Sequence, residues 1–198
     1  MAGELSARIA REFELTLETY RLMQADLVLL AQIEQAVTLC VDALLAGGKL
    51  LFVGNGGSAA DAQHWAGELV SRFYFERPGL AAIALTTDTS ILTAIGNDYG
   101  YDYTFARQIE ALGRTGDVLL AISTSGNSKN ILRAIEAARA RGLQIIGFSG
   151  ESGGAMAAGC TLCFKVPSRD TPKIQEGHEF LGHLICGLIE HALFGQRA

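Results

Sequence analysis

Short apolar runs alternate with segments of helical periodicity from residue 49 onward, and this alternation constrains the fold more than any other feature of the chain. The apolar runs cover residues 49–53, 81–85, 117–123, 144–149 and 160–166. Helical spacing falls between them, at residues 58–72, 90–96, 101–112 and 127–141, and again in a last segment at 172–194. Strands that are apolar throughout and separated by helices are typical of a parallel sheet covered on both faces. We therefore expect an α/β fold with a single doubly wound domain.

The first 46 residues have a different pattern, in which apolar side chains recur only at helical spacing. Gly47 and Gly48 end this pattern, so we expect one or two long amphipathic helices followed by a turn. We divide the chain accordingly into an N-terminal helical region used for oligomerisation, residues 1–48, and an α/β domain that includes the C-terminal helix, residues 49–198. No apolar run reaches the roughly 18 residues that a membrane span needs.

The overall charge argues against a nucleic-acid or anionic-membrane partner. The 198 residues carry a formal charge of −5, and Lys and Arg form no run. Mean hydropathy is +0.24, which we interpret as apolar surface buried between subunits, with a large core as the alternative. No secretory leader pattern precedes Glu4 and Arg8, so we expect a cytoplasmic, reduced protein. Of the four cysteines, Cys40, Cys160, Cys163 and Cys186, we expect the C-x-x-C pair Cys160 and Cys163 to be buried, inert thiols.

The loop after the first strand is rich in glycine and leads into a helix. It contains Gly54, Asn55, Gly56 and Gly57, and Ser58 is a good N-cap, so free N–H groups would point at a ligand. Three alternatives remain for this loop: a phosphate or sugar site, a dinucleotide site of the form G-x-G-x-x-A, and a purely structural turn. The dinucleotide signal is weak because no acidic residue ends the next strand at the required spacing of about 20 residues.

The loop after the third strand also leads into a helix and contains four hydroxyl side chains. Hydroxyls together with a helix N-terminus suit the dianion of a phosphate monoester, whereas a simple helix cap needs only one of them. The sequence does not match a Walker loop, because no Gly-Lys-Ser/Thr follows. The four hydroxyl residues are Ser123, Thr124, Ser125 and Ser128.

Two helices carry side chains with the chemistry of metal ligands or of acid/base catalysts. His64 and Glu68 are four residues apart and share a helix face, where they form an ion pair, bind one divalent metal, or act as a base and its partner. On the last helix, Gln175 and His183 are eight residues apart, so one metal reaches both only if their side chains converge or if subunits share the site. Glu179 and His183 are also four residues apart, and they pair with each other in the simplest interpretation.

Four stretches taken together resemble the phosphoheptose isomerases, which belong to the sugar isomerase (SIS) domain proteins. They are GNGGSAADAQH at residues 54–64, LTTDTSILTAIGND at 85–98, ISTSGNS at 122–128 and IQEGH at 174–178. The resemblance implies a flavodoxin-like sheet of five parallel strands and a homotetramer with active sites between subunits. It implies interconversion of D-sedoheptulose 7-phosphate and D-glycero-D-manno-heptose 7-phosphate through an enediol, at the start of ADP-heptose and GDP-heptose synthesis for lipopolysaccharide or another glycan.

The same resemblance implies a role for each matching residue. It implies one Zn²⁺ per subunit, and the positions that match the family's zinc ligands are His64, Glu68, Gln175 and His183. Glu68 and His183 match its acid/base pair. The positions that match its substrate contacts are Asn55, Gly56, Gly57, Ser58, Glu68, Asn97, Asp98, Ser123, Thr124, Ser125, Ser128 and Gln175.

Two other functions remain as alternatives to this assignment. Non-catalytic SIS proteins that bind the replication initiator DnaA, or that sense sugar phosphates, resemble the isomerases but tend to lose the acid/base residues. Glu68 and His183 are both present here, which favours the enzyme. The second alternative is an isomerase for a different sugar phosphate.

Overall fold

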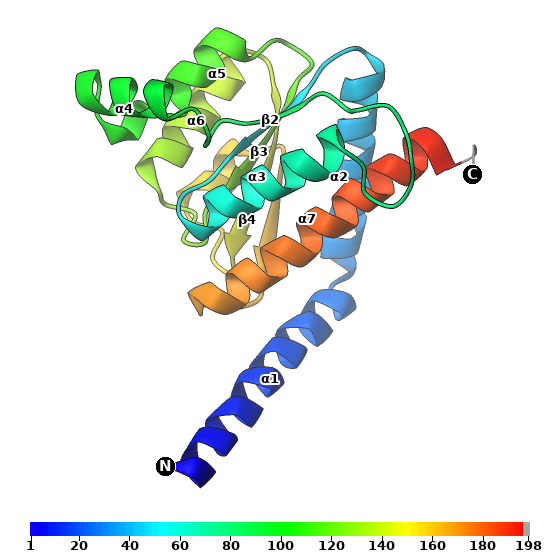
Figure 1. Cartoon of the computed structure of the whole chain (residues 1–198), viewed down its shortest axis with the longest axis vertical. Helices are drawn as coiled ribbons and strands as arrows, with labels where there is room; N and C mark the ends of the chain where they lie inside the picture. Colours follow the sequence, from blue (N-terminus) through cyan, green and yellow to red (C-terminus); the bar gives the residue numbers. More distant parts are fainter. Residues whose placement is uncertain (196–198) are drawn as a thin grey trace.

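The centre of the molecule is a sheet of five parallel strands in the order β2-β1-β3-β4-β5 (Figure 1). The computed structural model describes residues 1–195. The strands are β1 (Leu50–Val53), β2 (Ala82–Ala84), β3 (Val118–Ile122), β4 (Gln144–Gly150) and β5 (Leu162–Val166). Strand order and direction confirm the predicted doubly wound, flavodoxin-like α/β sheet.

Helices cover both faces of this sheet and bury both sides of its central strands. One face packs against α2 (Leu27–Leu45), α3 (Gly57–Val70) and α7 (Thr171–Phe194), and the other against α5 (Ala106–Leu112) and α6 (Lys129–Ala140). In β1, Leu50 and Phe52 point to the first face while Leu51 and Val53 point to the second, as the two-residue period of a strand requires. Every residue of the central strands β1 and β3 is therefore buried and apolar, which explains their uninterrupted apolar runs.

The remaining elements are short or lie at the margins of the sheet. The helix α4 (Thr89–Asp98) and the 3₁₀ turn η1 (Tyr101–Tyr103) connect β2 to α5, and a second 3₁₀ turn, η2 (Ala155–Gly159), precedes β5. The predicted helix over residues 101–112 is thus divided into η1 and α5. All four cysteines are free; Cys40 and Cys186 are buried, whereas Cys160 and Cys163 are half-buried.

The first helix, α1 (Ala2–Ala25), extends away from the body of the molecule, as Figure 1 shows. Asp26 separates it from α2 and caps α2, because its Oδ1 accepts hydrogen bonds from the N–H groups of Val28 and Leu29 at 2.9 and 3.1 Å. Along α1, Leu5, Phe13 and other large apolar side chains are more than half exposed. The sequence predicts one or two helices in this region, and the structure shows two, separated at a residue that the sequence did not indicate.

The helix α2 corrects one expectation from the sequence. Its 19 residues, with a mean hydropathy of 1.6, are long and apolar enough to cross a membrane, although no unbroken apolar run suggested it. Two acidic residues, Glu34 and Asp42, interrupt the run without lowering the average much. One side of α2 belongs to the core, where Leu29, Ile33 and Cys40 are buried with the strands. Packing is therefore continuous across the boundary drawn at residue 48, and the division into two domains stays a prediction.

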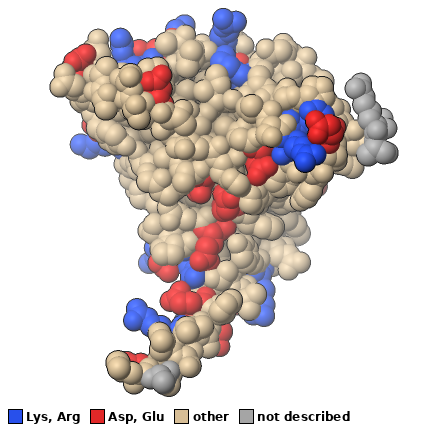
Figure 2. All heavy atoms as spheres, viewed as in Figure 1, with Lys and Arg blue, Asp and Glu red and all other residues tan. Residues whose placement is uncertain are grey.

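Charged side chains are dispersed over the face drawn in Figure 2. Acidic residues form a diagonal series across it, and the Lys and Arg side chains lie apart from one another with uncharged surface between them. A protein surface that binds phosphate backbones has its basic side chains concentrated on one face. This face of the molecule lacks that concentration.

Candidate functional site

The helices α3 and α7 approach each other closely because a glycine faces the only tryptophan. A Cβ atom added at Gly182 would lie 1.9 Å from Cε2 of Trp65, so only glycine permits this contact. His64 precedes Trp65 on α3, and His183 follows Gly182 on α7. The close crossing of the helices therefore brings two histidines that are 119 residues apart in sequence side by side.

These two histidines and Glu179 form a compact cluster at the crossing. The two Nε2 atoms are 2.7 Å apart, and Glu179 Oε1 lies 3.3 Å from His64 Nε2 and 3.2 Å from His183 Nε2. Candidate ligand atoms of the three residues all lie within 4.8 Å of one another. Imidazole nitrogens and a carboxylate oxygen are donors that Zn²⁺ accepts, so the residues present fit a metal of this type.

Glu68 and Gln175 lie at two sides of this cluster. Glu68 Oε1 is 3.4 Å from His64 Nε2, and its side chain is 23% exposed. Gln175 reaches the start of α3, since a Cβ atom added at Gly57 would lie 2.5 Å from Gln175 Nε2. The structure thus brings Glu68, His64 and His183 together, with Gln175 two turns before His183 on the same helix.

Glu179 is the member of the cluster that sequence reasoning did not assign to the site. Its Oε2 accepts a hydrogen bond of 2.9 Å from Trp65 Nε1, which fixes the carboxylate beside both histidines. Its spacing of four residues from His183 placed the two on one helix face. Nothing in the sequence, however, indicates that Trp65 crosses α7 at this point.

Asp61 lies on the same helix, one turn before His64. Burial and the nearby Glu179 carboxylate raise the pKa of Asp61 to about 6, while His64 acts in the opposite direction. Its buried Oδ2 atom has no hydrogen-bond partner within residues 1–195. The Asp61 carboxyl group is therefore a further acidic neighbour of the cluster.

The first predicted loop lies at the carboxyl end of β1 and is shaped by its glycines and a pair of asparagines. Gly56 has a φ of +56°, which favours glycine. Asn55 exchanges hydrogen bonds with Asn130 of α6 at 2.8 and 2.9 Å, and Asn55 Oδ1 also accepts one from the Tyr101 hydroxyl at 3.0 Å. Ser58 is buried in the first turn of α3.

The second predicted loop lies beside the first, because β3 pairs directly with β1. Ser123 is buried and donates a hydrogen bond of 3.1 Å to the hydroxyl of Ser128, the N-cap of α6. Ser128 makes no side-chain bond to the backbone of its own helix, so the first N–H groups of α6 lack that cap. Thr124 and Ser125 complete the loop, and Ser125 Oγ accepts a bond from the Asn127 N–H. This is the arrangement expected for an anion site.

Two predicted substrate contacts lie elsewhere on the chain. Asn97 and Asp98 are exposed at the end of α4, and the Asn97 side-chain amide donates a 2.8 Å hydrogen bond to Asp98 Oδ1. Both side chains are therefore open to solvent.

An open hollow of about 500 Å³ adjoins the histidine cluster. Its lining comes entirely from α3 and the residues just after it. The cluster is half-exposed toward solvent, with His64 47% and His183 41% exposed, so a small polar molecule has access to it. The residues that line the hollow are Gln63, His64, Gly67, Glu68, Ser71 and Arg72.

Comparisons with known proteins point to one family. Residues 20–150 match the SIS domain family model. The chain is 60% identical over 175 residues to phosphoheptose isomerase of Burkholderia pseudomallei, covering 88% of this chain and 89% of the relative. It is 58% identical over 170 residues to phosphoheptose isomerase of Aneurinibacillus thermoaerophilus, covering 86% of each.

Two solved structures are similar over nearly their whole length. The phosphoheptose isomerase from Neisseria gonorrhoeae has a TM-score of 0.87 and 45% identity, covering 93% of this chain and 99% of that one. The phosphoheptose isomerase from Francisella tularensis has a TM-score of 0.89 and 39% identity, covering 93% of this chain and 97% of that one.

Proposed function

Because the chain belongs to the phosphoheptose isomerases, a family of SIS-domain proteins, we propose that the cluster at the α3–α7 crossing is its active site. The chain is an aldose–ketose isomerase acting on D-sedoheptulose 7-phosphate, as the resemblance implied. The convergence of Glu68, Glu179 and two histidines from two helices is the observation that carries the assignment of the site.

The isomerisation moves one proton from C1 to C2 and a second proton from O1 to O2. We assign Glu68 as the base that removes the proton from C1 of the ketose, so that the C1–H bond breaks and the C1–C2 double bond of the enediol forms. Its conjugate acid then returns a proton to C2. His183 carries the second proton between the two oxygens, so that O2 ends as a hydroxyl and O1 as the aldehyde oxygen.

We further propose that the site holds one Zn²⁺ per subunit. The residues that would hold it are His64, Glu68, Gln175 and His183, and Glu179 lies beside both histidines as an additional donor. When bound, such an ion supplies Lewis-acid polarisation of the sugar's carbonyl oxygen. Glu179 keeps the two imidazoles oriented, because one carboxylate oxygen contacts both rings while Trp65 holds the other.

We assign the two loops at the ends of β1 and β3 to the remainder of the sugar phosphate. The hydroxyls of the second loop and the N-terminus of α6 suit a phosphate group, which anchors the far end of the substrate and orients its carbonyl end. The first loop offers close backbone approach to the sugar through its glycines. The proposed contacts in the loops are Asn55, Gly56, Gly57, Ser58, Ser123, Thr124, Ser125 and Ser128, with Gln175, Asn97 and Asp98 beyond them.

We also propose that the enzyme is a cytoplasmic homotetramer with active sites between subunits. The exposed apolar side chains of α1, and those of Leu27, Val28 and Leu30 on the outer side of α2, support this, because monomeric proteins rarely leave such area uncovered. Its product then enters the synthesis of nucleotide-activated heptose, ADP-heptose or GDP-heptose, for lipopolysaccharide or another glycan.

Turnover of sedoheptulose 7-phosphate by the purified chain, measured with its metal content, tests the proposed site. We expect about one zinc per subunit by elemental analysis, loss of both zinc and activity after chelation, and recovery of both when zinc is restored. Full activity at zero metal content would exclude the metal. Absence of turnover at every metal concentration would favour the alternative, a non-catalytic SIS protein that binds the initiator DnaA.

A further inference from the structure

A buried ion pair joins α7 to the segment that follows α3. The side chains of Arg77 and Glu190 are 1% and 0% exposed, and Arg77 Nε lies 3.0 Å from Glu190 Oε1. Burying such a pair costs desolvation energy, and replacing it with apolar side chains of similar size is often neutral or stabilising. The presence of this ion pair therefore suggests that it positions the two segments it joins.

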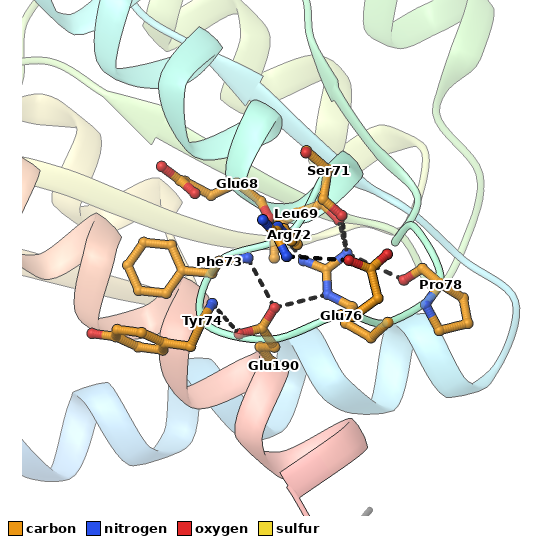
Figure 3. Close-up of polar contacts among 10 residues, drawn as sticks. Glu68, Leu69, Ser71, Arg72, Phe73, Tyr74, Glu76, Pro78 and Glu190 are labelled. Carbon is orange, nitrogen blue, oxygen red and sulfur yellow. Dashed lines mark hydrogen bonds and ion pairs between the residues drawn. The ribbon is translucent and has the colours of Figure 1, made fainter. Parts of the chain in front are cut away.

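Arg77 holds the end of α3 through its main-chain carbonyl groups. Its Nη2 donates a hydrogen bond of 2.7 Å to the carbonyl of Glu68 itself, and its Nη1 donates one of 2.6 Å to the carbonyl of Leu69. Nη1 also reaches the carbonyls of Ser71 at 2.9 Å and Pro78 at 3.1 Å. Figure 3 draws Glu68, Leu69, Ser71 and Pro78 together with these polar contacts as dashed lines. The backbone that carries the Glu68 carboxylate is thereby fixed.

Glu190 holds the other part of the same segment. It accepts hydrogen bonds from the N–H groups of Phe73 at 2.9 Å and Tyr74 at 2.7 Å, which Figure 3 draws as dashed lines between these residues and Glu190. In the described part of the chain, the three polar partners of this carboxylate therefore all come from residues 73–77.

Phe73 connects this segment to the ring of His183. The centroids of the two rings are 5.6 Å apart, with 40° between their planes. Gly187 leaves room for Phe73, because a Cβ atom added there would lie 3.2 Å from its Cε1. His183, Gly187 and Glu190 are spaced i, i+4 and i+7, so they share one face of α7.

We propose that Arg77 and Glu190 are positioning residues for the isomerisation, which set the distance between Glu68 and His183. The pair fixes Glu68 through its main-chain carbonyl and His183 through the packed ring of Phe73. One buried ion pair therefore determines the positions of both groups that transfer protons. This inference rests on the proposed roles of Glu68 and His183. Misplacing a reacting group by about 1 Å can cost roughly 10²-fold in rate, so the effect is measurable.

The test is the double variant Arg77→Met/Glu190→Met, which replaces the pair without leaving an unpaired charge. We expect a folded protein whose kcat falls by about 10- to 100-fold, with KM for sedoheptulose 7-phosphate changed less than about threefold because the phosphate loops are untouched. A second variant, Phe73→Leu, keeps the ion pair and removes the ring from His183. We expect the same pattern, a lower kcat at nearly constant KM, and this variant decides the outcome if the double variant does not fold.

A matched control is provided by Lys49 and Asp117, whose ion pair joins the residues that directly precede β1 and β3. Like Glu190, Asp117 accepts two backbone N–H groups, those of Lys49 and Arg114, and one cation, Lys49 Nζ at 2.5 Å. Lys49→Met/Asp117→Met removes an equivalent network whose bonds involve no residue of α3 or α7, so we expect a lower melting temperature at wild-type kcat.

Two results would overturn the inference: wild-type kcat in folded Arg77→Met/Glu190→Met, or a loss of kcat equal to that of the control. Glu68→Gln assayed in parallel separates this failure from failure of the proposed catalytic roles. If Glu68→Gln is inactive while the double variant is fully active, only the positioning role is wrong. If Glu68→Gln is fully active, the acid/base assignment fails and the positioning role fails with it.

Discussion

The carboxylates of Glu68 and Glu179 both approach His64, and the other contacts of each carboxylate indicate which function it has. Glu179 uses one oxygen for both histidines and the other for the Trp65 N–H, so both of its oxygens are engaged. Glu68 approaches only His64 among these groups, at 3.4 Å, and borders the open hollow. Within residues 1–195, Glu68 is therefore the one of these two carboxylates with an oxygen free to meet a substrate, which agrees with its proposed role as the base.

Glu68→Gln should consequently lower kcat by about 10²- to 10⁴-fold, the usual cost of losing a positioned acid or base. Glu179→Gln should cost less, because its side-chain oxygen can still accept the Trp65 hydrogen bond. Steady-state kinetics of the two variants, with thermal melting as a check on folding, compares them directly. Greater damage from Glu179→Gln than from Glu68→Gln would exchange the assigned roles.

Buried His178 should make the free energy of unfolding fall at acidic pH, independently of the chemistry at the site. It is fully buried, its Nε2 donates a 3.1 Å hydrogen bond to the Ser149 carbonyl, and Nδ1 has no partner within residues 1–195. Burial lowers the pKa of His178 to about 4. In the unfolded chain the pKa returns to about 6.5. The unfolded state therefore binds the extra proton first, and stability present above pH 6.5 is lost as the pH falls toward 4.

His178→Gln, which keeps an N–H donor but cannot titrate, should flatten this dependence. Between pH 6 and pH 5 the wild-type free energy of unfolding should fall by roughly 1 kcal/mol more than that of the variant. Urea unfolding at both pH values measures the difference. Residue 178 is the only position at which the two proteins differ, so equal slopes would show that His178 is not responsible.

At the scale of elements, Asp26 both ends the projecting helix and starts the helix that joins the core. Its carboxylate is the only side-chain cap of α2, so Asp26→Ala should lower the free energy of unfolding by about 1 kcal/mol. Asp26→Asn preserves the capping oxygen and should cost much less. Chemical denaturation of the two variants gives the comparison, and equal losses would show that charge, and not the cap, is the stabilising property.

Most helices and strands could be predicted from the sequence, because each has its own periodicity. The strands observed at 50–53, 118–122 and 162–166 fall inside the predicted apolar runs. The end of α1 could not be predicted, since neither glycine nor proline marks residue 26. Glu179 was missed for a related reason: its place in the site depends on the contact between Gly182 and Trp65, which is a tertiary property.

At the scale of the whole molecule, an apolar groove of about 560 Å³ runs between α1, α2 and α7. Its walls include Leu17, Met23, Leu30 and Phe180, and α1 continues beyond it with Leu5, Ile9 and Phe13 exposed. A helix that projects with such side chains gains most by packing against other copies of itself. This is the surface on which the proposed homotetramer depends.

Phe13→Glu/Leu17→Glu should therefore dissociate the tetramer into smaller species. Sedimentation or light scattering at several concentrations measures the mass, and the activity of the smaller species shows whether the site needs neighbouring subunits. Leu112→Glu, a comparable change on the far face of the sheet, should leave the mass unchanged. A wild-type that is already monomeric, or a variant of unaltered mass, would exclude this interface.

The contact between Gly182 and the Trp65 indole has a consequence for how this enzyme can change. The spacing of the two histidine-bearing helices depends on the absence of a single methyl group, so Gly182→Ala would separate the imidazoles without altering any polar atom. A catalytic centre of this kind can be inactivated by a purely hydrocarbon substitution. Substitutions intended to change the sugar specificity are accordingly better tolerated in the phosphate and sugar loops. At the contact between α3 and α7, even the smallest side chain has no room.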